Sequence, residues 1–393
     1  MRNFWSQTHW LIGITAGVVL AVVGVTGGML SFEHELLRLS NPGVMTVTPR
    51  AERLLPVEVL AERMRAAQPD KRLVSVSLSV EPDEAARAGF TPRPAERAGD
   101  KDKAPTPEAR PRTEFLYFDP YTGESLGKAA GQEFFRTVTQ FHRYLVAGDV
   151  GKHIVGASTI GLLIMSFSGL YLRWPRRIAD WRAWFTVDLS RKGRRFLWHL
   201  HAVTGTWVLL FYLLTGFTGL YWSYEWYRNG LFALSGSTPP AREAATLDEP
   251  ARGAPDIARV WEAFERESGG YRSVTLNFPQ KLDQAVDIRY LDVDPAHNRA
   301  TSRMMLHPAS GAMIRHDRYS DRALGARLMS SMLSLHSGSY FGLIGTILVM
   351  LASLFMPVFA VTGWQMYLAR RAKQGAARNA ATKTPIADSV AKM

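Results

Sequence analysis

Residues 11–32 read LIGITAGVVLAVVGVTGGMLSF and contain no charged side chain. A helix of this length spans the hydrocarbon core of a bilayer, which needs about 20 apolar residues. Three further uncharged stretches of spanning length occur at Ile154–Leu172, Ala202–Tyr224 and Ser337–Ala369. The last is longer than one span needs and contains Pro357, so we expect it to begin outside the hydrocarbon and to kink near that proline. The sequence therefore predicts a membrane protein with four transmembrane helices.

Net charge and cysteine content narrow the possible functions. The formal net charge is +12, but the basic residues cluster beside the apolar stretches, which indicates membrane topology and not nucleic-acid binding. The chain has no cysteine, which excludes disulfides, iron–sulfur clusters, thiolate zinc sites and covalently attached c-type haem. Any metal or cofactor must therefore be held by His, carboxylate, Met or Tyr side chains.

The basic residues also set the expected orientation, because cytoplasmic loops are enriched in Lys and Arg. They gather between the second and third stretches and after the fourth, at Arg173, Arg176, Arg177, Arg182, Arg191, Lys192, Arg194, Arg195, Arg370, Arg371 and Lys373. We therefore expect both termini in the cytoplasm and the long links 33–153 and 225–336 in the periplasm of a bacterial cell. No small-residue cleavage site follows the first stretch, so it is expected to remain as a signal anchor in the inner membrane.

The chain contains an internal duplication of one unit made of a helix, an outer domain and a second helix. The first matches pair Arg2, His9, Gly13, Thr26, Gly27 and Glu33 with Arg194, His201, Gly205, Thr218, Gly219 and Glu225. The second pair His142, Gly151, Gly169 and Arg177 with His336, Gly345, Gly363 and Arg371. Both copies begin on the same side, so the repeats are parallel and a pseudo-two-fold axis along the membrane normal is expected.

The two long links read as related α+β domains. Amphipathic helix patterns occur at Pro56–Ala67 and Ile257–Glu267. Each precedes alternating, strand-like stretches, at Leu73–Val80, Phe115–Phe118, Ser273–Phe278 and Ala285–Val293. The sequences DPYTG at 119–123 and HPASG at 307–311 have Pro and Gly where hairpin turns place them. A charged insertion rich in Pro and Ala, Arg87–Arg112, is expected to be a disordered loop in the first domain.

Four of the ten histidines occupy matched positions at helix ends. His9 and His201 lie at the cytoplasmic starts of the first and third stretches, and His142 and His336 lie just before the second and fourth, on the outer side. A pseudo-two-fold axis brings each matched pair together from opposite sides, which suits a planar macrocycle held by two axial imidazoles. A single His at a helix end is as often only an interfacial anchor, but retention of all four in diverged copies favours ligation. The sequence predicts two b-type haems, one held by His9 with His201 and one by His142 with His336.

The other histidines are weaker candidates. His34 and His153 lie at the outer interface and are alternative ligands of the outer haem, and His199 is an alternative to His201. Surface or turn roles are expected for the three in the second outer domain, His297, His307 and His316. Aromatic side chains either fill the space between the haems or only pack there; the candidates are Phe167, Phe211 and Phe217.

Four short motifs around these histidines resemble a known family. They are QTHWLIG at 7–13, FHR at 141–143, LHAVTG at 200–205 and LHSG at 335–338. They are similar to the PepSY-associated transmembrane proteins, which include iron-regulated membrane proteins and bacterial ferric-siderophore reductases. The resemblance covers about residues 1–372 and implies a b-haem reductase of the inner membrane with two periplasmic PepSY domains. It also implies electrons from the cytoplasm or the quinone pool, and a separate donor, because no flavin module follows Arg371.

The expected fold class is membrane α-helical, with four transmembrane helices in two parallel helix–PepSY–helix repeats and two periplasmic α+β PepSY-like domains. The expected transmembrane segments are 1–33, 141–175, 199–226 and 331–371. The expected PepSY-like domains are 34–140 and 227–330, with a cytoplasmic loop at 176–198 and a cytoplasmic tail at 372–393.

The expected function is haem-dependent reduction of a ferric siderophore, with membrane lipid and an electron donor or quinol as the other partners. Two other classes of protein compete with it. One is a haem-free PepSY membrane module that binds peptides or regulates a protease. The other is a transporter with parallel repeats, which the uncharged spans, of which only the fourth is broken, argue against.

Overall fold

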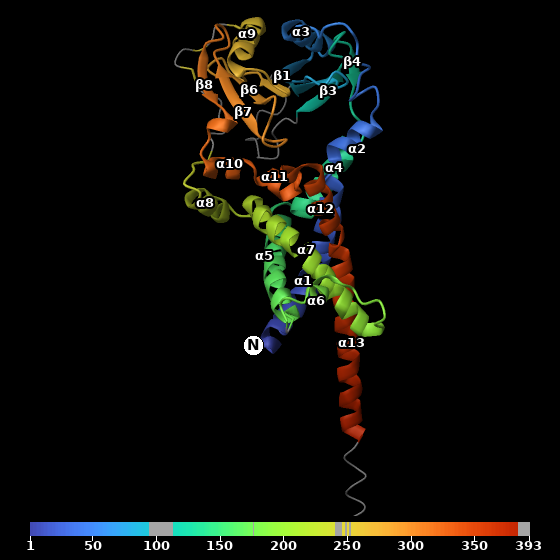
Figure 1. Cartoon of the computed structure of the whole chain (residues 1–393). Helices are drawn as coiled ribbons and strands as arrows, with labels where there is room; N and C mark the ends of the chain where they lie inside the picture. The colour runs from blue at the N-terminus through green and yellow to red at the C-terminus, as the bar shows by residue number, and fades with distance from the viewer. Residues whose placement is uncertain (94–112, 176, 240–245, 248–249, 251–252, 384–393) are drawn as a thin grey trace, which may run out of the picture. The chain divides into compact units, whose positions relative to one another are not determined.

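The computed structural model describes residues 1–93, 113–175, 177–239, 246–247, 250 and 253–383. The chain folds into two compact units, each built from segments far apart in the sequence (Figure 1). The helical unit comprises Met1–Ser31, Phe135–Asn229 and Leu335–Met393, and the sheet unit comprises Phe32–Phe134 and Gly230–Ser334. Residues 94–112 of the expected disordered loop lie outside the described residues, as does Arg176.

Four long helices in the helical unit have the length and composition to cross a membrane. They are α1 (Arg2–Leu30), α5 (Gly148–Arg173), α7 (Gly193–Ser223) and a fourth that consists of α12 (Gly342–Leu354) and α13 (Met356–Lys383). The four helices expected from the uncharged stretches are therefore confirmed. Shorter elements adjoin them: α4 (Gln132–Tyr144), α6 (Trp181–Phe185), α11 (Met332–Ser337) and the 3-10 turn η4 (Ser339–Phe341).

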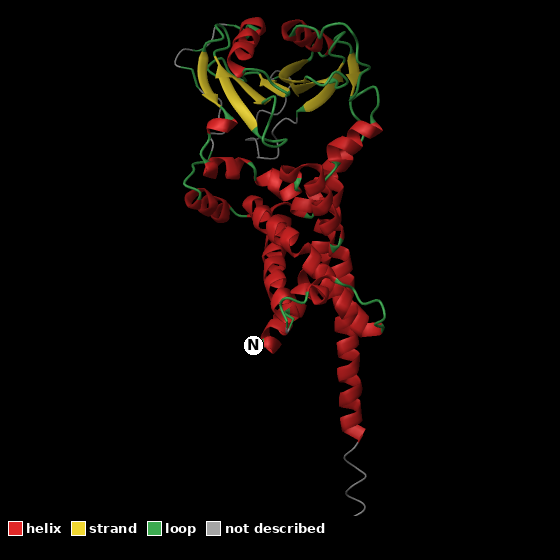
Figure 2. Ribbon diagram, viewed as in Figure 1, coloured by secondary structure: helices red, strands yellow, loops and turns green. Residues whose placement is uncertain are grey.

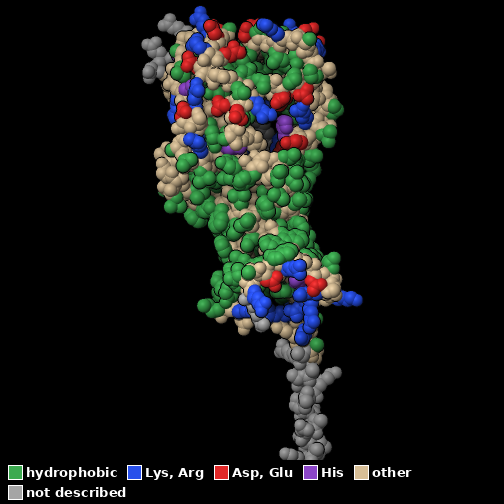
Figure 3. Space-filling model, viewed as in Figure 1, with side chains coloured by type: hydrophobic (Ala, Val, Ile, Leu, Met, Phe, Trp, Pro, Cys, Tyr) green, Lys and Arg blue, Asp and Glu red, His purple; other side chains and the backbone are tan. Residues whose placement is uncertain are grey.

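The outer surface of the helical unit is hydrophobic. Figure 3 shows hydrophobic side chains around the helices, with Lys and Arg gathered at one end. Val18, Leu210 and Ile344 are between 70% and 75% exposed. A bundle in water buries such side chains, whereas lipid accepts them on the outside. The chain is therefore a membrane protein.

Small residues allow close helix packing in this unit. At Gly24 of α1, an added Cβ would lie 2.5 Å from the Ser353 carbonyl oxygen and 2.5 Å from Met356 Cβ. At Gly28 it would lie 2.9 Å from Leu354 Cδ2. Only glycine fits where two membrane helices come so close. The glycine-rich run within α1 is thus a surface for helix packing, as its place in an apolar stretch predicts.

The fourth span is interrupted near its proline, as expected. α12 ends at Leu354 and α13 begins at Met356, so Pro357 lies in the first turn of α13, where its missing N–H costs no hydrogen bond. α13 continues to Lys383, well past the expected boundary at residue 371. Five of the twelve residues 372–383 are Ala, the strongest helix former, and two are Lys.

One antiparallel sheet of eight strands, in the order β4-β3-β2-β1-β5-β6-β7-β8, dominates the sheet unit (Figure 2). The strands are β1 (Lys71–Ser79), β2 (Ala86–Pro92), β3 (Glu114–Phe118), β4 (Ser125–Gly127), β5 (Ser273–Asn277), β6 (Val286–Leu291), β7 (Thr301–Leu306) and β8 (Met313–Asp317). The helices α3 (Val57–Ala67) and α9 (Ile257–Ser268) contribute Leu60, Met64 and Phe264 to its hydrophobic core. Both helices expected from amphipathic patterns are thus present.

The two expected outer domains are joined into this single sheet. β1 of the first half pairs with β5 of the second, with Ser77 opposite Thr275. The two hydroxyls on these residues lie 2.9 Å apart. One core then includes side chains from both halves, among them Val76 and Leu276. The separate domains expected at 34–140 and 227–330 are therefore one β-sheet unit, because main-chain pairing between distant strands leaves no local pattern in a sequence.

The prediction of a disordered loop over Arg87–Arg112 was wrong for its first residues. Residues 87–92 belong to β2, where Ala86, Ala88 and Phe90 are buried and Arg87 is exposed. Gly89 is buried as well, so burial does not alternate strictly along β2, and its Ala, Gly and Pro content gives the strand no clear pattern in the sequence. The two expected hairpin turns are confirmed: Gly123 and Gly311 have φ of +70° and +68°, which suits glycine.

Several short elements had no clear signal in the sequence. They include the strands β4, β7 and β8 and four helical segments. The helical segments are α2 (Glu33–Ser40), α8 (Glu225–Leu234), α10 (Leu324–Ser330) and the 3-10 turn η3 (Tyr319–Asp321). Strands of three to six residues and helices of one or two turns are too short to show a periodicity of their own.

Candidate functional site

The four matched histidines lie in two pairs inside the helical unit. His9 of α1 faces His201 of α7, with ring centroids 6.2 Å apart and ring planes at 71°. His142 of α4 faces His336 of α11, also at 6.2 Å, with planes at 68°. These are the pairs that the repeat matches predict. We call them the inner pair and the outer pair, respectively.

The outer pair lies just before the second and fourth spans, as predicted, so the expected segments 141–175 and 331–371 begin too early to be membrane helices throughout. His142 belongs to α4, and Leu145 and Val146 then turn the chain in the left-handed region, with φ of 49° and 57°, before α5 begins. His336 belongs to α11, which ends before Gly338, at φ +78°. Positive φ values end a helix, so each outer histidine is carried by a short helix of its own.

Each of the four imidazoles has its Nδ1 atom against a hydroxyl group of a neighbouring helix. The contacts are His9 with Ser168 (3.0 Å), His142 with Thr26 (3.2 Å), His201 with Thr362 (2.8 Å) and His336 with Thr218 (3.0 Å). All four hydroxyl residues are buried. Among the described residues, none of the four Nε2 atoms has a hydrogen-bond partner.

A glycine follows each of these hydroxyl residues and makes room for the ring. An added Cβ would lie 3.0 Å from the Cε1 atom of His142 at Gly27 and 3.2 Å from that of His336 at Gly219. It would also lie 3.2 Å from Cε1 of His9 at Gly169, and 3.9 Å from Cε1 of His201 at Gly363. The same Ser/Thr-Gly step therefore receives each histidine.

The hydroxyl partners were missed as functional residues in the sequence. Thr26 and Thr218 are matched positions of the duplication, and the pair Ser168 and Thr362 precedes matched glycines. A Ser/Thr-Gly step at four matched places was therefore a usable signal. To use this signal, one would also have to know that each Ser/Thr-Gly dipeptide packs beside a histidine of a different helix.

The geometry of both pairs fits a haem iron between two imidazoles. With a metal–nitrogen bond of about 2 Å on each side, plus half of each ring, two coaxial imidazoles have centroids about 6 Å apart. Both pairs have this separation, and within the described part of the chain no hydrogen bond is made by any of the four Nε2 atoms. Among the described residues no three His, Asp or Glu side chains gather to hold a bare ion. The two pairs are thus the candidate metal ligands of the described residues.

The two pairs lie at different levels of the bundle. Thr26, which contacts His142, lies about 25 Å farther along α1 than His9, at a rise of about 1.5 Å per residue. A hydrophobic cluster that includes Leu20, Leu162 and Val208 occupies the interior of the bundle. Such an interior excludes water, which suits a porphyrin and its two neutral axial ligands.

Aromatic side chains line part of this interior, and Phe211 is one of them, whereas the other two candidates from the sequence are not. Phe359 lies 5.0 Å from the His201 ring and 5.8 Å from the Tyr212 ring, between ring centroids. Phe211 packs against the cluster as expected. Phe167 and Phe217 are 53% and 45% exposed, so they face outward and do not fill the space between the pairs.

The three weaker alternatives lie outside both pairs. His34 of α2 and His153 of α5 are exposed, and the His153 ring lies 6.1 Å from the Tyr224 ring. His199 of α7 is buried, but its Nε2 lies 3.2 Å from the Thr186 carbonyl oxygen, to which it donates. A side chain engaged with the loop in this way does not share the place of His201.

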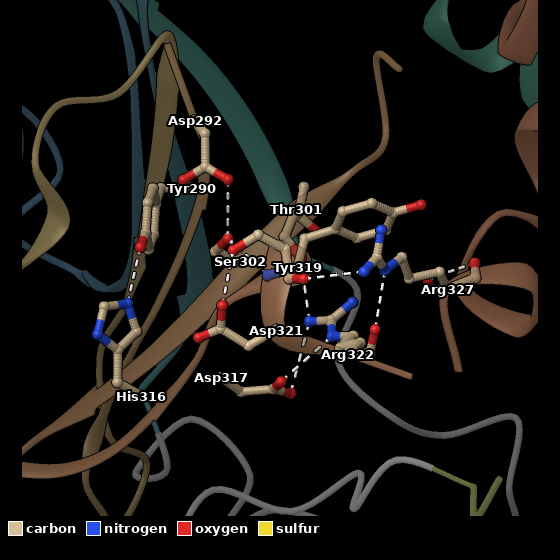
Figure 4. Close-up of polar contacts among 12 residues, drawn as sticks. Tyr290, Asp292, Thr301, Ser302, His316, Asp317, Tyr319, Asp321, Arg322 and Arg327 are labelled. Carbon is tan, nitrogen blue, oxygen red and sulfur yellow. Dashed lines mark hydrogen bonds and ion pairs between the residues drawn. The ribbon is translucent and has the colours of Figure 1, made fainter. Parts of the chain in front are cut away.

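The remaining histidines belong to the sheet unit and have structural contacts. His307 has the expected turn role, because its Nδ1 accepts a hydrogen bond from the Ser310 N–H at 3.2 Å. His316 is half-buried and its Nε2 lies 2.7 Å from the Tyr290 hydroxyl, as Figure 4 shows. His297 is only 6% exposed, so a surface role is wrong for it.

His297 joins the end of the sheet to the segment that follows β8. Its Nε2 lies 2.9 Å from Ser331 Oγ and 3.1 Å from the Tyr319 hydroxyl, while its Nδ1 accepts from the Arg299 N–H at 3.2 Å. Tyr319 is held in turn by Ser302, whose Oγ accepts from the Tyr319 N–H at 3.0 Å (Figure 4). The network needs a neutral imidazole, because Nδ1 acts as an acceptor.

We expect the sheet unit to lose stability as the pH falls below about 6.5. Burial lowers the pKa of His297, and Arg299 lowers it further. The unfolded chain therefore binds the proton more readily, so the stabilisation is present above the unfolded pKa and is lost as pH falls towards the folded one. Urea unfolding between pH 7.5 and 5.5 measures this loss, and His297→Gln should show a weaker pH dependence. An equal dependence in both proteins would contradict the prediction.

The sheet also carries a polar cavity on the face away from α3 and α9. Its volume is about 630 Å³, and Ser75, Asn277 and Asp287 are among its lining residues. These residues alternate along their strands with core residues such as Val76 and Leu276, so they point to the opposite face. The volume lies in the range of about 300–1,000 Å³ that is usual for sites of small molecules.

Comparison with known proteins assigns the family. No curated protein matches the chain. A family model described as the PepSY-associated TM region matches residues 6–370, which is nearly the whole chain, including all four paired histidines. The chain belongs to the family of the PepSY-associated TM region.

Proposed function

We propose that this protein binds two b-type haems and carries electrons across the inner membrane to a periplasmic acceptor. The observation that supports this most directly is the inner pair and the outer pair of histidines, which lie at two levels of an apolar bundle. Within each pair the two ring centroids are 6.2 Å apart. The inner pair would hold the haem nearer the cytoplasm and the outer pair the haem nearer the periplasm. Electrons would come from a separate cytoplasmic donor or from the quinone pool.

Haem, when bound, supplies reversible one-electron chemistry. The chain's own residues position it and keep it dry. The Nε2 atoms of His9, His201, His142 and His336 have no hydrogen-bond partner among the residues that the structure describes, and the neighbouring hydroxyls orient their rings. The hydrophobic cluster between the pairs keeps water out of the interior of the bundle. The stretches 11–32, 154–172 and 202–224 of the spans contain no charged residue, so the environment favours a neutral ligand set.

The acceptor that we propose is an Fe(III)–siderophore, which is reduced to release Fe(II). A transmembrane electron path needs an acceptor on its outer side, and the sheet unit offers a polar cavity of small-molecule size. Ser75 and Asn277 provide hydrogen-bonding groups in that cavity, and Arg289, whose Nε lies 3.4 Å from an oxygen of Asp287, lines an adjoining hollow. Oxygen-rich chelates suit such a surface. Release follows because hard oxygen ligands hold Fe(II) much less tightly than Fe(III).

This proposal includes two parallel helix–PepSY–helix repeats with the sheet unit in the periplasm. The repeat matches and the basic residues between α5 and α7 support it. Reporter fusions test the orientation. A fusion after Arg177 should report the cytoplasm, and a fusion after Asp256 should report the periplasm. The opposite result would overturn both the orientation and the direction of electron flow.

The decisive experiment follows haem and iron together. The purified protein is reduced with dithionite, freed of excess reductant and mixed anaerobically with ferric hydroxamate or ferric catecholate siderophores and a ferrous-specific dye. We expect prompt reoxidation of the haem spectrum with a matching amount of trapped Fe(II). The reaction should disappear in His142→Ala and His336→Ala, which lack the outer haem.

Two results would go against the proposal. A reduced haem spectrum that no ferric chelate changes would remove the siderophore as acceptor and leave another periplasmic redox partner. A purified protein without any haem absorbance would instead favour the haem-free PepSY module that binds peptides or regulates a protease.

A further inference from the structure

We infer that four buried hydroxyl residues, Ser168, Thr26, Thr362 and Thr218, fix the ligand nitrogen of the four histidines and lower the reduction potentials of the haems. The inference rests on the proposed function, since it concerns the haem ligands. It adds positioning residues that no motif of the four histidines contains. The argument begins with the hydrogen of each hydroxyl.

Each hydroxyl group already donates its hydrogen within its own helix. Thr26 donates to the Val22 carbonyl oxygen at 2.7 Å, and Thr218 donates to that of Leu214 at 2.6 Å. Thr362 donates to the Val358 carbonyl at 2.7 Å, while Ser168 donates to the Met165 carbonyl at 3.2 Å. A hydroxyl has one hydrogen and two lone pairs. Each of these oxygens is therefore left as an acceptor.

An acceptor at Nδ1 requires that Nδ1 carries the imidazole proton. The neutral ring then has its lone pair on Nε2, the atom without a protein partner, so Nε2 is the metal-binding nitrogen in all four histidines. The Nδ1–H bond also fixes the rotation of the ring and makes the ligand a stronger base. A more basic axial ligand stabilises the ferric state over the ferrous state and so lowers the reduction potential.

The four contacts are not equivalent. Thr362 is the closest of the hydroxyls, at 2.8 Å, and it is the partner that the structure gives His201 Nδ1. His142 Nδ1 has a second acceptor, the Val23 carbonyl oxygen at 3.0 Å, besides Thr26 at 3.2 Å. Loss of Thr362 should therefore affect the inner haem more than loss of Thr26 affects the outer haem.

The test measures midpoint potentials by optical redox titration of the purified full-length protein. Thr362→Val is combined with His142→Ala in one protein, which removes the outer haem, so that the potential of the inner haem is measured alone. Thr26→Val is combined with His9→Ala, which removes the inner haem, so that the potential of the outer haem is measured alone. We expect Thr362→Val to favour reduction about threefold to tenfold, a positive shift of at most about 59 mV for a one-electron couple. Thr26→Val should give a smaller shift in the same direction.

Thr346→Val is the matched control. Thr346 is a buried threonine of α12 whose hydroxyl donates to the Gly342 carbonyl oxygen of its own helix at 3.2 Å, and its hydroxyl contacts no paired histidine among the described residues. Its replacement should leave both potentials unchanged. Thr362→Ser keeps the hydroxyl and should restore the wild-type potential.

The outcomes separate the inference from the function. If wild-type protein binds two haems and Thr362→Val keeps the wild-type inner potential, the inference is wrong and the proposed function stands. If Thr362→Val loses the inner haem and Thr362→Ser retains it, the positioning role is supported. If Thr362→Val and Thr346→Val lose the inner haem to the same extent, the positioning role is contradicted. The loss would then come from removing a hydrogen bond within a helix, which both threonines make. A wild-type protein without haem would refute both.

Discussion

We expect that replacing His9 or His201 by Ala will remove one of the two proposed haems and leave the other in place. The inner and outer pairs have no histidine in common. Thr26, which contacts His142 of the outer pair, lies about 25 Å along α1 from His9 of the inner pair. A haem iron that loses one of two axial imidazoles loses half of its protein ligation. Haem counted per chain should fall from two to one, and the remaining reduced-minus-oxidised spectrum should be that of a bis-histidine haem. His142→Ala and His336→Ala should remove the other haem.

His199→Ala is the control for this prediction. His199 lies two residues before His201 on the same helix, but its Nε2 is bonded to the Thr186 carbonyl oxygen at 3.2 Å. The variant should keep both haems. Loss of both haems in a folded His9→Ala protein would show that the sites are not independent. Retention of both would show that His9 is not a ligand.

The four spans and the two pairs could be predicted because each has a local signal. A span is an uncharged stretch of sufficient length, and its extent depends little on its neighbours. The four histidines stand at matched positions in the sequence, and the two-fold relation that we propose between the two copies would bring matched residues together. In the structure His9 lies beside His201, and His142 lies beside His336, which are the matched pairs.

The hydroxyl partners could not be predicted in the same way. Thr26 and His142 are on different helices, and the contact depends on how α4 packs against α1. The sequence shows Thr26 only as one matched residue among several. Ser168 is less visible still, since it differs in type from Thr362, the residue at the matched position.

The sheet was also only partly predictable. Patterns of alternation reveal β1 and β5, but nothing in either strand specifies that they pair with each other. β2 was hidden because Ala, Gly and Pro lower the strand signal and because burial does not alternate strictly along it. Long-range pairing is a property of the whole fold, and one sequence records it weakly.

Gly219→Leu should remove the outer haem while the inner haem remains. A Cβ at this position would lie 3.2 Å from His336 Cε1, closer than ordinary van der Waals contact, and the rest of a leucine side chain would need the space of the ring. Overpacking of this kind costs about 1–3 kcal/mol where the surroundings can move. We expect the His336 side chain to rotate away from Thr218, which moves its Nε2 atom away from the haem site of the outer pair. Haem per chain should fall from two to one.

Two glycines serve as controls for this prediction. Gly363→Ala should keep both haems, because its Cβ would lie 3.9 Å from His201 Cε1, an ordinary contact. Gly375→Leu should also keep both, since an added Cβ there meets nothing within 4 Å. Full haem content in Gly219→Leu would mean that His336 is not held against α7 in the haem-bound protein. Loss of haem in Gly375→Leu would mean that any large residue in these helices disturbs the bundle, so the effect at Gly219 would not be specific to His336.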